Sequence, residues 1–419
     1  MVHVVVLGTC DTKLDELLFL CEAIRRADPN VGVSLIDVGR SEIKHEAITY
    51  THSNLIENYG KGQQVDDLPR GELIKRMAGY ATALVKELYE KADGTYIDGI
   101  ISAGGSGGTS LAAAVMRDAL PIGFPKMIVS TVASGDTGPI VEETDITLMY
   151  SVVDVAGLNQ LLRNVLSNAG AAIAGMATSY ASRRALSPPG VKARVGITMF
   201  GVTTPAVDAI RKHLESKHNV ETYVFHATGH GGKAMERLVR EGGLDAVLDL
   251  TTTEVCDFLT GGVMSAGDDR LEAAAKAGIP NLVSVGATDM SNFGPKSTVP
   301  ERYKSRKLYE HNPMVTLMRT SQEEAKEVGS FIVSQLKKHA RDPAMIEVWL
   351  PKGGVSMIAT PDGPFADASA DEAMFKALYD GLDSSDIKVK EDGRDINDSS
   401  FARDIAEALM EKVRVHRTS

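Results

Sequence analysis

The sequence ISAGGSGGTS at residues 101–110 places four glycines within five positions. An apolar segment, residues 96–101, precedes these glycines, and a helix-forming segment, residues 111–116, follows them. The stretch therefore predicts a strand, a tight turn and the first turns of a helix. Glycines let a ligand approach the backbone closely and allow positive φ, and a helix N-terminus presents unpaired N–H groups and a positive dipole end. These properties predict an anion pocket, with phosphate as the usual occupant.

The glycine turn is not a Walker A loop, because no Lys-Ser or Lys-Thr pair closes it, and it does not follow the first strand as the dinucleotide fingerprint does. The alternative is a turn in which glycines only permit close packing of helix on strand. We favour phosphate binding, because packing alone rarely needs so many adjacent glycines beside several hydroxyls. The candidate ligand residues of this turn are Gly104, Gly105, Ser106, Gly107, Gly108 and Thr109.

A second candidate turn lies near the start of the chain. Residues 2–7 form an apolar run typical of a buried parallel strand, and they end at Gly8-Thr9-Cys10-Asp11-Thr12-Lys13. A helix with apolar residues at helical spacing follows. Asp11 is placed either to cap this helix or to lie beside a bound phosphate or its magnesium ion. The two roles are compatible, and the sequence leaves both open.

Length and composition predict a globular protein of two domains, since the chain has 419 residues, 43% of them apolar and 24% charged. A formal net charge of −11 without a Lys/Arg run argues against a nucleic-acid surface. The apolar run at residues 2–7 is too short to span a membrane or to act as a signal. Three cysteines without Cys-x-x-Cys spacing argue against a disulfide framework. We therefore expect a cytoplasmic protein with neither nucleic acid nor membrane as a partner.

Strands and helices alternate along the chain, which predicts the α/β class with two Rossmann-like domains. Each domain is expected to hold a mostly parallel sheet with helices on both faces. The segment Arg183–Gly190 contains two prolines and a glycine and is predicted to be a linker, giving domains of residues 1–185 and 191–419. Residues 41–67 are polar and weakly periodic, and we expect a long loop there.

The second domain repeats the order of strand, glycine turn and helix at Gly229–Gly232. His226 and His230 lie four apart, but Gly229 breaks the helix that a zinc site of this spacing needs. Cys256 has acidic neighbours, which disfavour the thiolate, so we expect it to pack in the core. The side chains of other turns in this domain suit the binding of a polar metabolite or acid–base chemistry. Taken one at a time, each of these residues is explained as a helix cap or as a solvated loop residue. These turn residues are Thr251–Glu254, Asp289, Lys352, Ser356 and Asp362.

Five motifs of the chain recur in the same order in one family. They are Gly8–Lys13, Gly104–Thr109, Ser151–Asp154, Asp249–Glu254 and His311–Pro313. On these motifs the chain resembles, over essentially its full length, the Tm-one-like ATP-binding family. That family includes the N-terminal region of a plant protein that blocks tobamovirus RNA replication, a role that we do not transfer. The resemblance implies two Rossmann-like domains, ATP with Mg²⁺ in the first domain, and a homodimer.

By position, the resemblance places the Gly104–Thr109 turn on one side of the nucleotide. It places the Gly8–Asp11 corner on the other side. From the residues themselves, the candidate ligands of this corner are Gly8, Thr9, Asp11 and Thr12, with Asp11 as the candidate magnesium ligand. Two alternatives to a plain ATP-binding protein stay open. One is an enzyme that uses ATP or another phosphorylated compound on a small polar metabolite held between the domains. The other is a regulatory or interaction protein in which ATP stabilises a dimer.

The helix predicted from Leu158 to about Tyr180 is rich in small residues between Ala169 and Ala177. Small side chains let another helix approach closely, so this segment is expected to be a packing surface. The sequence leaves open whether that surface packs within its own domain or between two copies of the chain.

Overall fold

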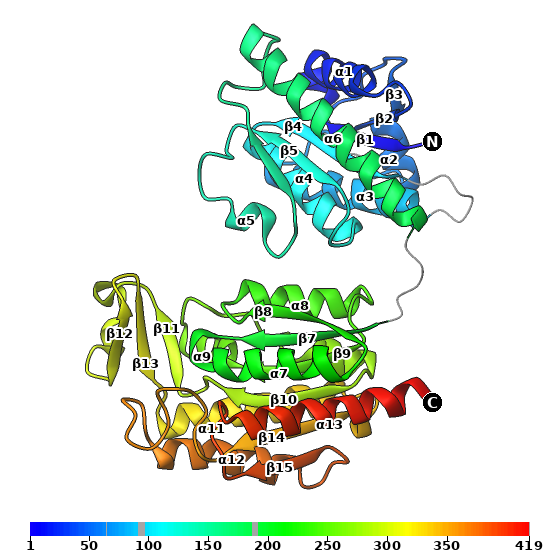
Figure 1. The fold of residues 1–419 in the computed structure, drawn as a ribbon. Helices are drawn as coiled ribbons and strands as arrows, with labels where there is room; N and C mark the ends of the chain where they lie inside the picture. The colour runs from blue at the N-terminus through cyan, green and yellow to red at the C-terminus, as the bar shows by residue number, and fades with distance from the viewer. Residues whose placement is uncertain (64, 91–96, 187–191, 419) are drawn as a thin grey trace. The chain divides into compact units, whose positions relative to one another are not determined.

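The computed structural model describes residues 1–63, 65–90, 97–186 and 192–418. The chain divides into two compact units, Met1–Pro189 and Gly190–Ser419 (Figure 1). Of the predicted linker Arg183–Gly190, residues 183–186 form the end of helix α6 (Gln160–Leu186), so that part of the prediction is wrong, and residues 187–190 lie outside the described residues. Within the described ranges, no helix combines the length and the apolar character that crossing a bilayer requires.

The first unit is built on a six-stranded sheet with the strand order β3-β2-β1-β4-β5-β6, and its paired strands are all parallel. This is the doubly wound order in which the chain reverses its direction of growth between the first and fourth strands. The elements are β1 (His3–Gly8), α1 (Cys10–Ala27), β2 (Gly32–Asp37), β3 (Ile48–Tyr50), α2 (His52–Tyr59), α3 (Arg70–Glu90), β4 (Gly99–Gly104), α4 (Ser106–Ala119), β5 (Lys126–Ser130), α5 (Gly138–Val141), β6 (Thr147–Tyr150) and α6 (Gln160–Leu186).

Helices cover both faces of this sheet (Figure 1). Val5 and Leu7 of β1 pack toward α3 and α4, and Val4 and Val6 pack toward α1 and α6. The alternation follows from the two-residue repeat of a strand, whose successive side chains point to opposite faces. Both faces are buried, which explains the continuous apolar run of the first strand.

The small-residue segment of α6 packs inside the first unit. Ala169, Ala174 and Ala177 are buried in the core against α1. At Gly170 an added Cβ would lie 2.8 Å from Cβ of Ala23, so only glycine permits this approach of the two helices. The close packing expected from the sequence therefore lies within the domain.

The prediction of a long loop at residues 41–67 is wrong in part, because β3 and α2 lie within this segment. Thr51 caps α2: its hydroxyl accepts from the N–H of Asn54, and the Asn54 side chain accepts from the N–H of Thr51. Leu55 and Ile56 are then buried against the sheet. An eight-residue helix is too short for its apolar repeat to stand out in the sequence.

The second unit holds a second six-stranded parallel sheet, in the order β15-β14-β10-β9-β7-β8. The two parallel sheets confirm the α/β class. The main elements are β7 (Ala193–Met199), α7 (Thr204–Lys217), β8 (Val220–His226), α8 (His230–Arg240), β9 (Ala246–Thr251), α9 (Thr253–Thr260), α10 (Glu272–Ala277), β10 (Asn281–Gly286), α11 (Gln322–His339), β14 (Ile346–Pro351), α12 (Ala368–Leu382), β15 (Lys388–Asp392) and α13 (Ser399–Thr418).

Helices α7 and α13 cover one face of this sheet, and α9, α11 and α12 cover the other. A three-stranded antiparallel sheet is added after β10, in the order β11-β13-β12. Its strands are β11 (Met290–Phe293), β12 (Leu308–Asn312) and β13 (Val315–Arg319). Most of β12 is exposed, so it lacks the apolar pattern of a strand.

Candidate functional site

A hollow in the first unit lies at the carboxyl ends of β1 and β4, the point where the strand order reverses. Doubly wound sheets bind their ligands at this switch point. The pocket has a volume of about 730 Å³, and both turns predicted from the sequence contribute to its wall. The structure thus brings together two segments about 90 residues apart, as expected when parallel strands end at the same edge.

Seven of the ten predicted site residues line the pocket: Thr9, Asp11, Thr12, Gly105, Ser106, Gly107 and Gly108. Gly8, Gly104 and Thr109 are not among the lining residues. At Gly8 an added Cβ would lie 2.6 Å from both Cδ atoms of Leu17, so this glycine serves helix packing. The hydroxyl of Thr109 is buried and lies 2.7 Å from the hydroxyl of Ser130, which ties α4 to β5.

The glycines of the 104–108 turn do not adopt positive φ, so that part of the sequence argument is wrong. Their lack of a side chain matters in another way. A Cβ added at Gly108 would have no atom within 4 Å, and one added at Gly105 would meet only the Thr131 hydroxyl, at 3.8 Å. Neither backbone strain nor internal packing therefore requires these two glycines. What they leave free is the space directly above the backbone at the start of α4.

The N-terminus of α4 carries no capping side chain. Its N-cap residue is Gly105, and no side-chain hydrogen bond closes this end. The N–H groups of the first helical turn point along the helix axis, with the positive end of the dipole behind them. This end of the helix lines the pocket, and no side chain caps its N–H groups.

Three cationic side chains line the same pocket, in a chain whose net charge is −11. The Arg70 guanidinium lies over the glycine turn, with Nη2 3.1 Å from the position of a Cβ on Gly107. Arg70 is exposed, and no hydrogen bond or ion pair joins it to another described residue. Arg40 donates to the backbone carbonyls of Asp66 and Leu68, which holds it at the rim.

Lys13 of α1 is the third cation, and it fixes the opposite wall of the pocket. Its ammonium donates to the backbone carbonyl of Val155. One turn later along α1, the carboxylate of Glu16 accepts from the N–H of Gly157. Helix α1 therefore holds the loop after β6 through two hydrogen bonds. This wall of the pocket is fixed by contacts within the chain itself.

The loop held in this way contains the strained residue Val152. Its φ is +66°, and the N–H of Val153 donates to the carbonyl of Ser151 at 2.7 Å, which closes a three-residue turn around it. Positive φ is an outlier for a β-branched residue, and such strain gathers at ligand sites. Val152 is also 55% exposed and lines the pocket. Packing in the core does not account for its conformation.

Asp11 does not cap its own helix, because the N-cap of α1 is Thr9. Instead Oδ2 of Asp11 accepts from the N–H of Arg40 at 2.8 Å and from the N–H of Ser41 at 3.4 Å. The other oxygen, Oδ1, is buried without a hydrogen-bond partner among the described residues. A second carboxylate, that of Asp154, is exposed and lines the pocket.

Asp37, at the end of β2, holds two segments of this corner together. Its Oδ1 accepts from the N–H of Cys10 at 3.0 Å and from that of Gly39 at 2.9 Å, which joins the two loops that carry Asp11 and Arg40. Burial raises the pKa of this carboxyl against the effect of those two hydrogen bonds. Sequence reasoning assigned no role to Asp37, Arg40, Arg70, Val152 or Asp154. All of them except Arg70 lie at the end of a strand or within four residues after it, so their position near a strand end was an available signal.

Two family profiles match the chain. The N-terminal domain of the Uncharacterised protein family (UPF0261) matches residues 2–182, and the C-terminal domain of the same family matches residues 192–413. The chain belongs to the UPF0261 family.

Several relatives extend over nearly the whole chain. The UPF0261 proteins of Clostridium tetani and Mesorhizobium japonicum are each 43% identical to it, over 97% and 98% of this chain and 98% and 99% of their own lengths. The tomato ToMV resistance protein Tm-1(GCR237) is 40% identical over 97% of this chain, which spans 55% of the tomato protein. This homology confirms the resemblance found from the motifs.

Likeness to solved structures is weak. The E. coli heptosyltransferase WaaC with ADP-2-deoxy-2-fluoro heptose matches with a TM-score of 0.24 and 12% identity, over 68% of this chain and 90% of that one. A TM-score this low supports no argument about function.

In this UPF0261 protein the second glycine turn, Gly229–Gly232, is closed by the chain itself. Oε1 of Glu254 accepts from the N–H of Gly229 at 2.7 Å and from that of Gly232 at 3.0 Å. The Glu254 carboxylate thus occupies the N-terminus of α8, where an external anion would otherwise bind. Arg270, fully buried, donates to Oε2 of Glu254 at 2.8 Å and to both oxygens of Asp249.

The other polar turns of the second unit are also largely internal. Thr251, Thr252, Thr253 and Glu254 have no exposed surface, and neither do Asp289 and Ser356, whose side chains bond to each other at 2.9 Å. Lys352 lies 3.4 Å from the carboxylates of both Glu372 and Glu391. Asp362 is exposed. Cys256 is buried, and burial together with Asp257 raises its pKa well above the ordinary thiol value.

Proposed function

We propose that the first domain of this protein binds ATP as its magnesium complex, with the phosphates at the N-terminus of α4. The observation that carries the proposal is the open space over Gly105 and Gly108, in a pocket that is also lined by the Arg70 guanidinium beside Gly107. A phosphate group in that space accepts from the N–H groups of α4 and pairs with the arginine. The family resemblance, which implies ATP, agrees with this chemistry.

The pocket is larger and more apolar than an inorganic phosphate needs. Its volume of about 730 Å³ lies in the range of pockets for small organic ligands. Beside the polar groups, a set of aliphatic side chains forms the rest of the wall and suits the faces of a purine. These side chains are Val38, Leu73, Ile74, Leu111, Val152 and Val153.

The two carboxylates of the pocket fit a magnesium ion. Mg²⁺ is bound through one or two carboxylates together with phosphate oxygens, and it keeps several waters. Asp154 offers an exposed carboxylate, and Asp11 offers Oδ1, the oxygen that accepts no hydrogen bond in the described structure. Without a cation, both carboxylates would repel the phosphates, so the ion would supply the charge that makes triphosphate binding favourable.

Arg70 provides the test, because it contacts the proposed phosphate position and has no structural partner among the described residues. Isothermal titration of the full chain with ATP in magnesium should show one site, and Arg70→Gln should weaken binding by roughly 10- to 100-fold. Adenosine and inorganic phosphate, each tested alone, should bind more weakly than ATP.

Arg26→Gln is the matched control. Arg26 lies on the exposed side of α1, 3.6 Å from Glu22, and does not line the pocket. This variant should bind ATP as the wild type does. No heat of binding with the wild-type chain, or equal affinities for Arg70→Gln and wild type, would contradict the proposal.

A further inference from the structure

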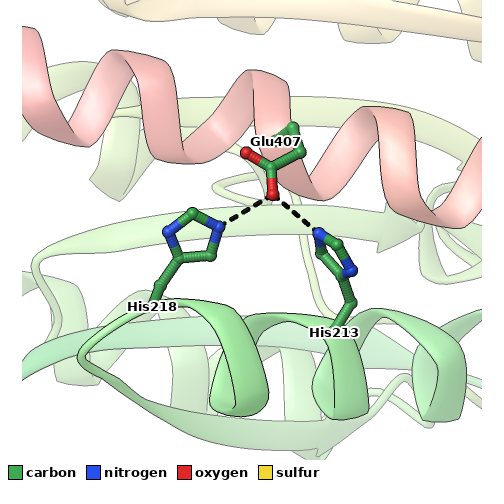
Figure 2. A group of neighbouring side chains, drawn as sticks. All are labelled: His213, His218 and Glu407. Atoms are coloured by element: carbon green, nitrogen blue, oxygen red, sulfur yellow. Dashed lines mark hydrogen bonds and ion pairs between the residues drawn. The ribbon is translucent and has the colours of Figure 1, made fainter.

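Three side chains of the second domain converge at a place that the candidate nucleotide site does not include. His213 lies on α7, His218 is the residue that ends this helix, and Glu407 lies on α13. Figure 2 shows both imidazoles pointing at the same carboxylate from the opposite helix. Nε2 of His213 lies 2.7 Å from Oε1 of Glu407, and Nε2 of His218 lies 2.9 Å from the same oxygen. In the part of the chain that the structure describes, this is the one group of three that meets the geometry of a metal site.

The two histidines come together because helix α7 ends between them. His213 and His218 are five residues apart, a spacing that does not place two side chains together on a continuous helix. At His218 the backbone turns extended, with φ −127° and ψ 156°, while its N–H still donates to the carbonyl of Leu214. The second imidazole is thereby brought back beside the first. Their ring centroids are 6.2 Å apart.

The distances are close to those that a metal ion requires. The three ligand atoms all lie within 4.8 Å of one another. Zinc binds histidine nitrogen at about 2.0–2.1 Å and carboxylate oxygen at about 2.0–2.2 Å, so tetrahedral ligand atoms lie about 3.3 Å apart. Each Nε2–Oε1 distance needs to open by roughly half an ångström for an ion to enter.

The surroundings permit an ion to enter and to keep a water ligand. The Glu407 side chain is 45% exposed, and those of His213 and His218 are 18% and 15% exposed. A hollow of about 400 Å³ beside Glu407 is lined by three acidic residues, Asp404, Glu407 and Glu411, and by Lys390 and Arg414. Arg414 pairs with the other oxygen of Glu407 at 3.7 Å, which leaves Oε1 to the imidazoles.

We propose that His213, His218 and Glu407 bind a zinc ion, with solvent in the fourth position. Two imidazoles and one carboxylate suit zinc and the neighbouring late transition metals, and they do not suit Mg²⁺ or Ca²⁺, which prefer oxygen ligands. The site is independent of the proposed nucleotide pocket, because it lies entirely in the second domain.

A bound ion would clamp the C-terminal helix to the sheet. Glu407 and the two histidines are about 190 residues apart in sequence, and α7 and α13 already pack through a shared apolar core. An ion that binds only the folded arrangement raises stability by mass action. Zinc should therefore protect α13 against unfolding.

Titration of the metal-free full chain with zinc chloride tests the proposal. One equivalent should bind to the wild type, and His213→Ala, His218→Ala and Glu407→Gln should each weaken binding by about 100-fold. Cobalt chloride on the wild type should give the intense visible bands of a four-coordinate site, and these should be absent from the three variants.

His311→Ala serves as the control, because His311 is an exposed histidine of the same domain. It should bind zinc as the wild type does. The melting temperature of each variant, with and without zinc, separates loss of the ion from loss of the fold, since only the zinc-dependent increment should disappear. No zinc binding to the wild type, or equal binding by the wild type and the three variants, would overturn the proposal.

Discussion

The two glycine turns of the molecule have the same local plan and opposite environments. In each, a parallel strand leads through closely spaced glycines into the N-terminus of a helix. At Gly104–Gly108 the space in front of the helix is open, and Arg70 lies over it without a partner among the described residues. At Gly229–Gly232 the same space is filled by the carboxylate of Glu254. The N-terminus of α4 is left open to the pocket, and that of α8 already holds a carboxylate of the chain itself.

The glycines are needed for different reasons in the two turns. Gly229 has a φ of +90°, and a Cβ added at Gly232 would lie 2.1 Å from Oε2 of Glu254. Conformation and packing thus explain the glycines of the closed turn completely. Neither reason applies to Gly108, where a Cβ would meet nothing.

The strands that precede the two turns also lie at different places in their sheets. The open turn follows β4, a central strand beside β1 where the strand order reverses. The closed turn follows β8, which is the edge strand of its sheet. A glycine-rich turn therefore predicts a cluster of N–H groups, and the strand's place in the sheet indicates whether a ligand can reach it.

Arg270→Leu should produce the largest change in the closed turn. The substitution leaves Glu254, Asp249 and Glu236 buried together without their counter-ion. Removing one partner from a buried ionic network costs about 3–5 kcal/mol of unfolding free energy. Urea unfolding should show this loss, whereas Arg240→Leu, at an exposed site, should change stability by less than about 0.5 kcal/mol. Equal stability of both variants would mean that the network does not hold the turn.

Alanine at one glycine of each turn compares the two directly. Gly232→Ala should cost about 1–3 kcal/mol, because its Cβ overlaps Glu254 and comes within 2.7 Å of Nε of Arg270. Gly108→Ala should be neutral or stabilising by up to about 1 kcal/mol, since alanine is the better helix former and the space is empty. The measurement is the denaturant midpoint of both variants. Similar costs at the two positions would contradict the assignment of one turn as open and the other as closed.

Asp11→Asn should give a smaller effect, and one that depends on the metal. Asparagine keeps one oxygen to accept from the N–H of Arg40 but loses the charge that attracts magnesium. We expect ATP affinity to fall by about tenfold in magnesium, and to be unchanged or improved in EDTA because a repulsion is removed. If the affinities of variant and wild type are equal under both conditions, Asp11 only fixes the loop at Arg40.

Much of the fold follows from the sequence, because buried parallel strands are apolar on both faces and end at Gly, Ser, Thr or Asp. The run before Gly8 and the run before Gly104 are of this kind, and both are strands. Short or exposed elements escape this signal. β12 is mostly exposed, and α2 gains its burial from tertiary contacts that the local pattern does not encode.

The site could be predicted only in part, for a related reason. The corner at Thr9–Thr12 and the turn at Gly105–Gly108 follow adjacent strands, so the parallel topology alone brings them together. Arg70 lies at the start of α3, and its approach to Gly107 depends on tertiary packing. Similarly, the closure of the second turn depends on Glu254, about 25 residues further along the chain, so the local sequence does not distinguish a closed turn from an open one.

The most direct test of this account is ATP binding by Gly108→Val. Valine forms a helix better than glycine, and its side chain would stand in the empty space over the turn, so the fold should survive while phosphate is excluded. Gly79→Val is the matched control, an exposed helical glycine of the same domain with nothing within 4 Å of an added Cβ. By calorimetry in magnesium, Gly79→Val should bind ATP as the wild type does, and Gly108→Val should lose at least about 100-fold, since several charge-assisted hydrogen bonds are lost together. A folded Gly108→Val protein with wild-type affinity for ATP would contradict the account.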